Sequence, residues 1–166
     1  ALKESDNGYA ESFTKTLGFA TSGHGSFVEG VNAIKSILGD TTDIDFKDTA
    51  LFDGSGQSRY DLISPNQLSR LLYAMFHQRK LYKTFKKSLP ISGTDGTLKY
   101  RLGNDALRGK IFAKTGTMRG VSTLSGYMTT SSKRTIVFSI MTNHVIGKLR
   151  KAKSLENQLC QTLYQI

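Results

Sequence analysis

The segment of residues 109–128 constrains the fold of this chain more than any other, because it carries two runs that predict strands. Residues 111–113 are an apolar run between Lys110 and Lys114, and residues 121–127 alternate with a period of two. A period of two is typical of β-strands. A Thr-Gly-Thr sequence at residues 115–117 separates the two runs and predicts a turn. The segment is therefore expected to form a strand, a turn and a second strand.

The end of the first strand carries Lys114, Thr115, Gly116 and Thr117. These residues supply a cation, two hydroxyls and a glycine, which has no side chain to block the approach of another backbone. A strand edge of this composition is suited to holding a carboxylate group. The K-T-G motif alone is weak support for a function, because three-residue matches occur by chance in many proteins.

An S-D-N sequence stands near the start of the chain, at Ser5, Asp6 and Asn7. All three residue types are favourable N-caps, and apolar residues recur at helical spacing over residues 9–17. Capping of this helix and chemistry in the loop before it are compatible with each other. Ala10, Phe13 and Leu17 lie on one stripe of this expected helix.

K-T-G and S-D-N, together with an S-x-x-K motif, form the signature of penicillin-binding proteins and class A β-lactamases. The chain resembles the class C penicillin-binding proteins of low molecular mass in five stretches, which follow the family order: ESDNGYAE, LFDGSGQSRYDLISPNQL, SLPISGTDGTL, KTGTMRGVSTLSGYM and IVFSIMTN. That family comprises D-alanyl-D-alanine carboxypeptidases and endopeptidases. The resemblance extends from residue 4 to about residue 143.

The resemblance implies an α/β (α+β) fold, namely the C-terminal half of the β-lactamase/transpeptidase-like fold, with an antiparallel sheet flanked by helices. Residues 1–166 are then the C-terminal part of one such domain, mainly helical at 1–108 and with the strands and terminal helix at 109–166. In the family the S-x-x-K serine lies well upstream of S-D-N. We therefore expect that an N-terminal half with the nucleophile is missing here, and that the isolated chain is inactive.

The resemblance also implies a serine-type hydrolase that acts on peptidoglycan stem peptides ending in D-Ala-D-Ala, with β-lactam antibiotics as acylating mimics. The catalytic candidates are Ser5, which relays a proton to the leaving amine, and Lys114, which supplies positive charge. The substrate-binding candidates are Asn7, Thr115, Gly116 and Thr117. No metal and no other cofactor is implied, and the implied location is periplasmic or otherwise extracytoplasmic.

Two alternatives remain open at this point. A class A β-lactamase shares both motifs but needs a glutamate that activates the deacylating water, and the chain offers Glu11 and Glu29 without that enzyme's surrounding pattern. The other alternative is a non-catalytic module that binds cell-wall peptides. Ser12 and Lys15 also spell S-x-x-K, but Ser12 follows Ser5 by seven residues on the expected helix and is rejected as the nucleophile.

The net charge of +10 suggests a nucleic-acid partner at first. The basic residues, however, cluster at 79–87 and 148–153 with helical spacing, which is typical of solvated helix faces. Attraction to an anionic envelope polymer or to lipid headgroups is the alternative, and no nucleic acid is expected as a partner. Cys160 is the single cysteine, so no disulfide can form within the chain, and it is expected to be a small buried hydrophobe.

Several helical elements are predicted around these motifs. A helix is expected over residues 27–38 with a stop at Gly39, and Ser64 and Gln67 predict a capping box at the start of a further helix. The D-G-S-G sequence of residues 53–56 predicts a tight turn.

The last third of the chain predicts a strand and a helix. Residues 135–141 are nearly all apolar, which is typical of a strand buried on both faces. If the N-terminal half is missing, this strand has an unpaired edge, and the chain is expected to self-associate through it. A terminal helix is expected over residues 149–166. Its inward residues are expected to be Ala152, Leu155, Leu159, Cys160 and Leu163.

Overall fold

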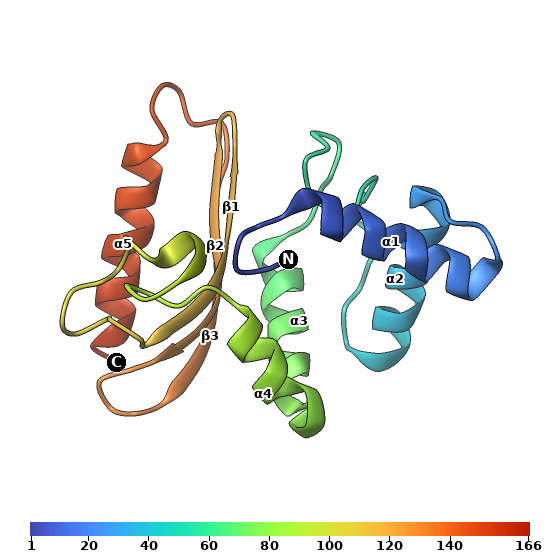
Figure 1. Ribbon diagram of the computed structural model, residues 1–166. Helices are drawn as coiled ribbons and strands as arrows, with labels where there is room; N and C mark the ends of the chain where they lie inside the picture. Colours follow the sequence, from blue (N-terminus) through green and yellow to red (C-terminus); the bar gives the residue numbers. More distant parts are fainter. The chain divides into compact units, whose positions relative to one another are not determined.

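The computed structural model describes residues 1–166 (Figure 1). The elements are α1 (Asn7–Ser22), α2 (Phe27–Thr41), α3 (Pro65–His77), α4 (Arg79–Ser88), the 3-10 helix η1 (Gly96–Leu98), β1 (Ile111–Met118), β2 (Val121–Thr129), β3 (Thr135–Thr142) and α5 (Arg150–Tyr164). The expected order of helices, three antiparallel strands and a terminal helix is confirmed. By their contacts the residues form two compact units: residues 6–74 with Ala1, and residues 2–5 with residues 75–166. No helix has both the length and the apolar character needed to cross a lipid bilayer.

In the first unit, α1 and α2 pack through small residues. Thr14 is buried on α1, and a Cβ atom on Gly30 of α2 would lie 2.2 Å from the Thr14 carbonyl oxygen. The two helix backbones can approach this closely only because residue 30 is a glycine. Phe13, on the apolar stripe identified in the sequence, is 62% exposed. Helical spacing identified an apolar stripe but not the face on which the backbones meet.

The helices α1 and α3 of the first unit begin where capping residues in the sequence predict. Asp6 is the N-cap of α1, and its carboxylate accepts a hydrogen bond from the Tyr9 N–H at 3.0 Å. The capping box is confirmed: the Gln67 N–H donates to Ser64 Oγ at 3.1 Å, and the Ser64 N–H donates to Gln67 Oε1 at 2.8 Å. The turn at residues 53–56 is also confirmed, with the Gly56 N–H donating to the Asp53 carboxylate at 2.6 Å.

The end expected for α2 at Gly39 is wrong, because the helix continues to Thr41. The Thr41 hydroxyl donates to the Ile37 carbonyl at 2.6 Å, and the Thr42 hydroxyl donates to the Leu38 carbonyl at 2.6 Å. These side chains satisfy carbonyl groups that a helix end leaves unpaired. A glycine is tolerated within the last turn when its neighbours stabilise the end in this way.

In the second unit the strands form one antiparallel sheet in the order β1-β2-β3. The predicted strand pair is confirmed, but the turn expected at residues 115–117 is wrong. β1 continues through these residues to Met118, which pairs with Val121, so Arg119 and Gly120 form the turn. Gly120 has a φ of +80°, a left-handed conformation that glycine adopts without strain and that reverses the chain here. Threonine is a good strand former, and two threonines keep this segment extended.

The strand buried on both faces is β2 and not, as expected, the segment 135–141. Residues 124–128 of β2 are all buried, whereas Phe138 is the only buried residue of the edge strand β3. The composition of β2 does not predict its burial, because small and polar residues occupy the positions where neighbouring strands and helices pack closely. A Cβ atom on Gly126 would lie 2.1 Å from the Phe112 carbonyl oxygen.

The two faces of the sheet are covered by different helices of the second unit. α5 lies along one face (Figure 1). The buried core on this side consists of Leu98, Leu102, Leu107, Ile111, Ala113, Leu124, Met128, Phe138 and Cys160. On the other face, the Tyr82 and Phe85 rings of α4 contact the buried Tyr127 ring edge-on, with centroid distances of 5.2 and 6.4 Å. The expected sheet flanked by helices is thereby confirmed.

α5 directs Ala152, Glu156 and Cys160 inward. Ala152 and Cys160 were expected there, but the inward positions expected for Leu155 and Leu159 are wrong, since these side chains are 48% and 40% exposed. The buried stripe follows four-residue steps through Glu156. A glutamate is rarely fully buried, so the sequence favoured the leucines.

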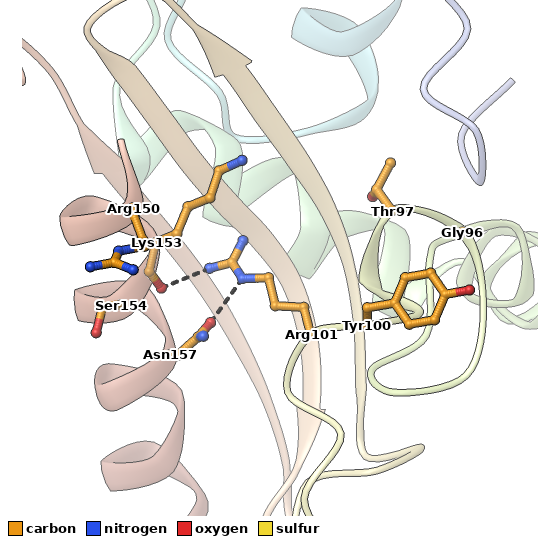
Figure 2. Close-up of a pocket in the computed structure, with 8 residues that line it drawn as sticks. All are labelled: Gly96, Thr97, Tyr100, Arg101, Arg150, Lys153, Ser154 and Asn157. Carbon is orange, nitrogen blue, oxygen red and sulfur yellow. Dashed lines mark hydrogen bonds between the residues drawn. The ribbon is translucent and has the colours of Figure 1, made fainter. Parts of the chain in front are cut away.

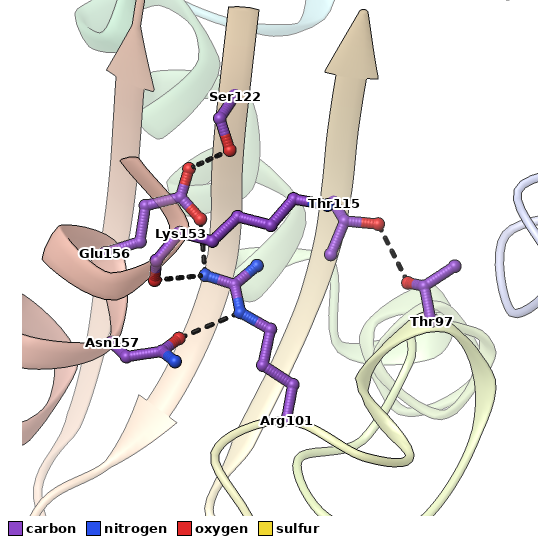
Figure 3. A network of polar contacts seen from close by, with 7 residues as sticks. All are labelled: Thr97, Arg101, Thr115, Ser122, Lys153, Glu156 and Asn157. Atoms are coloured by element: carbon purple, nitrogen blue, oxygen red, sulfur yellow. Dashed lines mark hydrogen bonds and ion pairs between the residues drawn. The ribbon is translucent and has the colours of Figure 1, made fainter. Parts of the chain in front are cut away.

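Glu156 belongs to a network that joins three elements of the second unit (Figure 3). Its fully buried carboxylate forms an ion pair with Arg101 and accepts a hydrogen bond from Ser122 Oγ at 2.6 Å. Arg101 also donates to Asn157 Oδ1 at 2.8 Å and to the Lys153 carbonyl at 3.1 Å. The network compensates the desolvation of both charges and connects α5 to β2 and to the segment before β1.

We predict that Glu156→Ala strongly destabilises the protein. Removing one partner of a buried pair leaves the other charge uncompensated, which costs about 3 kcal/mol or more. Urea unfolding at neutral pH measures this change. Gln161→Ala, an exposed substitution on the same helix, should stay within about 0.5 kcal/mol of the wild type. Equal stabilities of the two variants would contradict a structural role for the pair.

Candidate active site

The second unit brings Ser5 next to Lys114, although 109 residues separate them in the sequence. Lys114 Nζ donates to Ser5 Oγ at 2.6 Å and to the Thr115 carbonyl at 2.7 Å. Ser5 lies in the turn of residues 2–5 and has a φ of +56°. This left-handed conformation is unfavourable for a serine and persists only where the surroundings fix it. The two catalytic candidates therefore meet in one defined arrangement.

The ammonium of Lys114 is half-buried and lies beside a neutral hydroxyl. Burial lowers the pKa of Lys114 below its usual value, because the charged form loses hydration. No carboxylate forms an ion pair with Lys114 that would offset this loss. A lysine that releases its proton more easily, hydrogen-bonded to a serine hydroxyl, is suited to relaying a proton.

The outer edge of β1 is open beside this pair. The Ala113 N–H donates to the Pro90 carbonyl at 3.0 Å, and the Ser92 N–H donates to the Ile111 carbonyl at 3.0 Å, so backbone groups of odd-numbered β1 residues point away from β2. By the alternation of an antiparallel strand, the N–H of Thr117 points the same way. No backbone group of the chain bonds to it there. An extended peptide can pair with such an edge.

The three residues after Lys114 have different surroundings. The Thr115 hydroxyl donates to Thr97 Oγ1 at 2.8 Å, on the face covered by α5 (Figure 3). Thr117 is exposed. A Cβ atom on Gly116 would lie 2.3 Å from Thr123 Oγ1 of the paired strand, so a side chain here would force the Thr123 hydroxyl to move.

Asn7 is the first residue of α1, and its side chain is exposed. It belongs to the contact unit of residues 6–74, whereas Ser5, Lys114 and Thr117 belong to the other unit. Its role toward a substrate stays a prediction.

The S-x-x-K sequence at Ser12 lacks the geometry of a nucleophile motif. Ser12 Oγ donates to the Gly8 carbonyl at 2.8 Å, and Lys15 Nζ lies 4.3 Å from the centre of the Phe27 ring. The serine and the lysine therefore contact different partners. Glu11, considered above as a water-activating glutamate, accepts a hydrogen bond from the Gly54 N–H at 2.9 Å and holds a loop.

Sequence reasoning missed three residues next to the pair. Lys3 Nζ lies 2.6 Å from Asp95 Oδ2, and the Thr97 N–H donates to the Lys3 carbonyl at 3.1 Å. Residues 88–98 were quoted above only as a stretch of the family resemblance, and none of them was named as a candidate. The Asp-Gly-Thr sequence of residues 95–97 is ordinary turn chemistry, so it gave no signal of a contact with residues 2–5.

A separate cavity of about 520 Å³ lies between α5 and residues 96–101 (Figure 2). Its lining residues are Gly96, Thr97, Tyr100, Arg101, Arg150, Lys153, Ser154 and Asn157. Neither Ser5 nor Lys114 lines it. Three of its lining side chains are cationic, and they include part of the basic cluster at 148–153.

The antiparallel sheet, the terminal helix and the pairing of the S-D-N serine with the K-T-G lysine define a protein of the penicillin-binding peptidase class. The sequence profile of the D-Ala-D-Ala carboxypeptidase 3 (S13) family matches residues 1–165. The chain belongs to this family. The resemblance inferred from the sequence is confirmed.

Relatives and solved structures agree with this assignment. The chain is 35% identical over 147 residues to a D-alanyl-D-alanine carboxypeptidase of Actinomadura sp. (strain R39), covering 86% of this chain and 27% of the relative. It is 37% identical over 141 residues to the D-alanyl-D-alanine carboxypeptidase DacB of Haemophilus influenzae, covering 82% of this chain and 29% of the relative. The crystal structure of penicillin binding protein 4 (dacB) from Haemophilus influenzae matches with a TM-score of 0.90 and 30% identity, over 99% of this chain and 38% of that chain.

A more distant structure shares the fold alone. A predatory peptidoglycan endopeptidase from Bdellovibrio bacteriovorus matches with a TM-score of 0.72 and 17% identity, over 97% of this chain and 40% of that chain. The chain thus spans less than a third of the length of the two curated relatives named above.

We predict that Lys114 titrates below its usual pKa of 10.5, because burial disfavours its charged form. The folded protein then holds this proton less tightly than the unfolded chain does. Lys114 therefore destabilises the fold below its folded pKa, and this penalty disappears as the pH rises toward 10.5. NMR titration of ¹³C-labelled lysine side chains, with Lys114→Met to assign the signal, measures the pKa. A value at or above 10.5 would contradict the burial argument.

Proposed function

We propose that the protein containing this chain is a serine-type D-Ala-D-Ala carboxypeptidase that acts on peptidoglycan stem peptides and is acylated by β-lactams. We also propose that residues 1–166 form the C-terminal part of its transpeptidase-like domain, with endopeptidase activity toward the same class of peptides as a further capacity. The observation that carries the proposal is the 2.6 Å hydrogen bond between Lys114 Nζ and Ser5 Oγ in a member of the S13 family.

Acyl transfer needs a nucleophile, a proton relay, a clamp for the substrate carboxylate and an oxyanion hole. Ser5 and Lys114 supply the relay: the serine hydroxyl gives its proton to the leaving amine and takes one from the ammonium. The proposed nucleophile is a serine in another part of the protein. The S-x-x-K sequence at Ser12 does not supply it, since that hydroxyl is bonded to the Gly8 carbonyl.

The edge of β1 supplies the substrate-binding groups. The positive charge of Lys114 and the hydroxyl of Thr117 attract the terminal carboxylate, while the outward N–H of Thr117 is half of the oxyanion hole. The Thr115 hydroxyl donates to Thr97 Oγ1 in this structure, so it would reach the carboxylate only by turning its proton away from Thr97. Gly116 leaves the edge open for a peptide that pairs with it as an added strand. Asn7 donates its amide to a carbonyl of the substrate.

Partners and location follow from the proposed substrate. Peptidoglycan lies outside the cytoplasmic membrane, so a periplasmic or otherwise extracytoplasmic site is proposed. The remainder of the same protein is the proposed partner of this chain. Family membership favours the peptidase over a β-lactamase, and a non-catalytic module that binds cell-wall peptides remains the alternative that acylation tests.

We predict that the full-length protein forms a covalent adduct with labelled penicillin, and that Thr117→Val slows this acylation roughly tenfold or more. The variant loses a hydrogen bond to a charged group, worth about 1.5–3 kcal/mol, without touching the core. Thr135→Val is the matched control, since Thr135 is an exposed threonine at the start of β3. Both variants should melt within about 2 °C of the wild type. The absence of any adduct on the wild type would refute the peptidase and favour the binding module.

We predict that the 166-residue polypeptide, expressed alone, neither reacts with penicillin nor stays monomeric. β3 is the edge strand of the sheet, and its outer N–H and C=O groups have no partner strand in the chain. Light scattering at micromolar concentration should detect association through this edge. A strictly monomeric species would refute the edge as an interface, and acylation of this polypeptide would place a nucleophile within these residues.

A further inference from the structure

Residues 95–97 have the sequence Asp-Gly-Thr and lie between the two catalytic motifs in the second unit. On one side they contact the turn of residues 2–5, which carries Ser5. On the other side they contact Thr115 of the K-T-G motif. We call residues 95–97 the D-G-T turn.

Asp95 makes two hydrogen bonds with its two carboxylate oxygens. Oδ2 accepts from Lys3 Nζ at 2.6 Å, and Oδ1 accepts from the Ile91 N–H at 2.9 Å. Both the Lys3 and the Asp95 side chains are only partly exposed, at 29% and 38%. The carboxylate therefore links the Ser5 turn to the segment that pairs with β1 through Ile91 and Phe112.

Gly96 and Thr97 add backbone contacts to the turn of residues 2–5. Gly96 has a φ of +55°, and a Cβ atom on it would lie 2.6 Å from the Lys3 carbonyl oxygen. The Thr97 N–H donates to that same carbonyl at 3.1 Å. A side chain at residue 96 would therefore displace the backbone two residues before Ser5.

Thr97 also connects to the strand of the other motif. Its hydroxyl oxygen accepts from Thr115 Oγ1 at 2.8 Å (Figure 3). One residue thus contacts the Ser5 turn with its backbone and the K-T-G strand with its side chain. Ser5 itself needs such support, because its positive φ is held only where the surroundings fix it.

We propose that Asp95, through its ion pair with Lys3, is a positioning residue that holds the Ser5 hydroxyl in place for proton transfer to the leaving group. Gly96 and Thr97 act with it by fixing the Lys3 carbonyl and the Thr115 hydroxyl. The inference rests on the proposed function, because it assigns a role to Ser5 in that reaction.

The role of Ser5 in protonating the leaving group determines which substrates can test the proposal. In acylation the ester C–O bond forms and the scissile C–N bond breaks, while the nucleophilic serine loses one proton and the leaving nitrogen gains one. A displaced Ser5 therefore impairs the departure of an amine. A thiolate leaves without being protonated, so hydrolysis of a thioester analogue needs no proton from Ser5.

The experiment compares amide and thioester substrates in the full-length protein. Asp95→Asn, which loses the charge but keeps an acceptor for the Ile91 N–H, should lower kcat/KM for the amide about tenfold or more and for the thioester about twofold or less. Lys3→Gln should have the same effect, and Lys3→Arg, which can keep the ion pair, should restore the amide activity. Asp105→Asn, a substitution at an exposed aspartate, is the matched control and should change neither value.

A second measurement does not depend on activity. Hydrogen–deuterium exchange of residues 2–5 and of the Thr97 N–H should become faster in Asp95→Asn and remain unchanged in Asp105→Asn. If the wild type cleaves both substrates but Asp95→Asn lowers both equally, or if exchange stays at the wild-type rate, the positioning role is overturned. If the wild type is inactive toward both substrates and penicillin, the proposed function fails, and the exchange measurement alone decides whether Asp95 holds the Ser5 turn.

Discussion

The alternation of side chains along β1 determines what each residue of the K-T-G motif contacts. Ile111 and Ala113 point into the core under α5, so Thr115 lies on that same face and meets Thr97. Lys114 points to the opposite face, where it meets Ser5. A shift of one residue in the pairing with β2 would exchange the two faces and bury the lysine among apolar side chains. The register of this strand pair is therefore the constraint on which the site depends.

Much of this arrangement could be predicted from the sequence. The apolar run of residues 111–113 and the alternation of residues 121–127 identified the strand pair, and S-D-N with K-T-G identified the class of site. The placement of the turn failed for a local reason, since Thr115 and Thr117 are as compatible with a strand as with a turn. The decisive signal was Gly120, whose positive φ closes a two-residue hairpin four residues later than expected.

The rest could not be predicted, because it depends on contacts between residues far apart in sequence. Nothing near Glu156 indicates that Arg101 and Ser122 will satisfy its charge, so helical spacing favoured Leu155 and Leu159. The contact between Gly30 and Thr14 is likewise a property of two helices and not of either one. The ion pair of Lys3 with Asp95 joins residues that are 92 positions apart.

Arg101 and Lys114 are both partly buried cations of the second unit, but with opposite consequences. Arg101 is bonded to the Glu156 carboxylate, the Asn157 amide oxygen and the Lys153 carbonyl, so its charge is compensated and the network holds the fold together. Close to this network, burial raises the pKa of the Cys160 thiol to about 12, although the Arg101 charge opposes the rise and the Glu156 charge adds least to it, so this cysteine is not a nucleophile.

Lys114 has only a hydroxyl and a carbonyl as partners, and burial lowers its pKa. A cation that is paired with a carboxylate stays protonated, whereas a partly buried cation without a carboxylate partner can release its proton. The difference explains why these two partly buried cations take different roles, Arg101 in stability and Lys114 in the proposed chemistry.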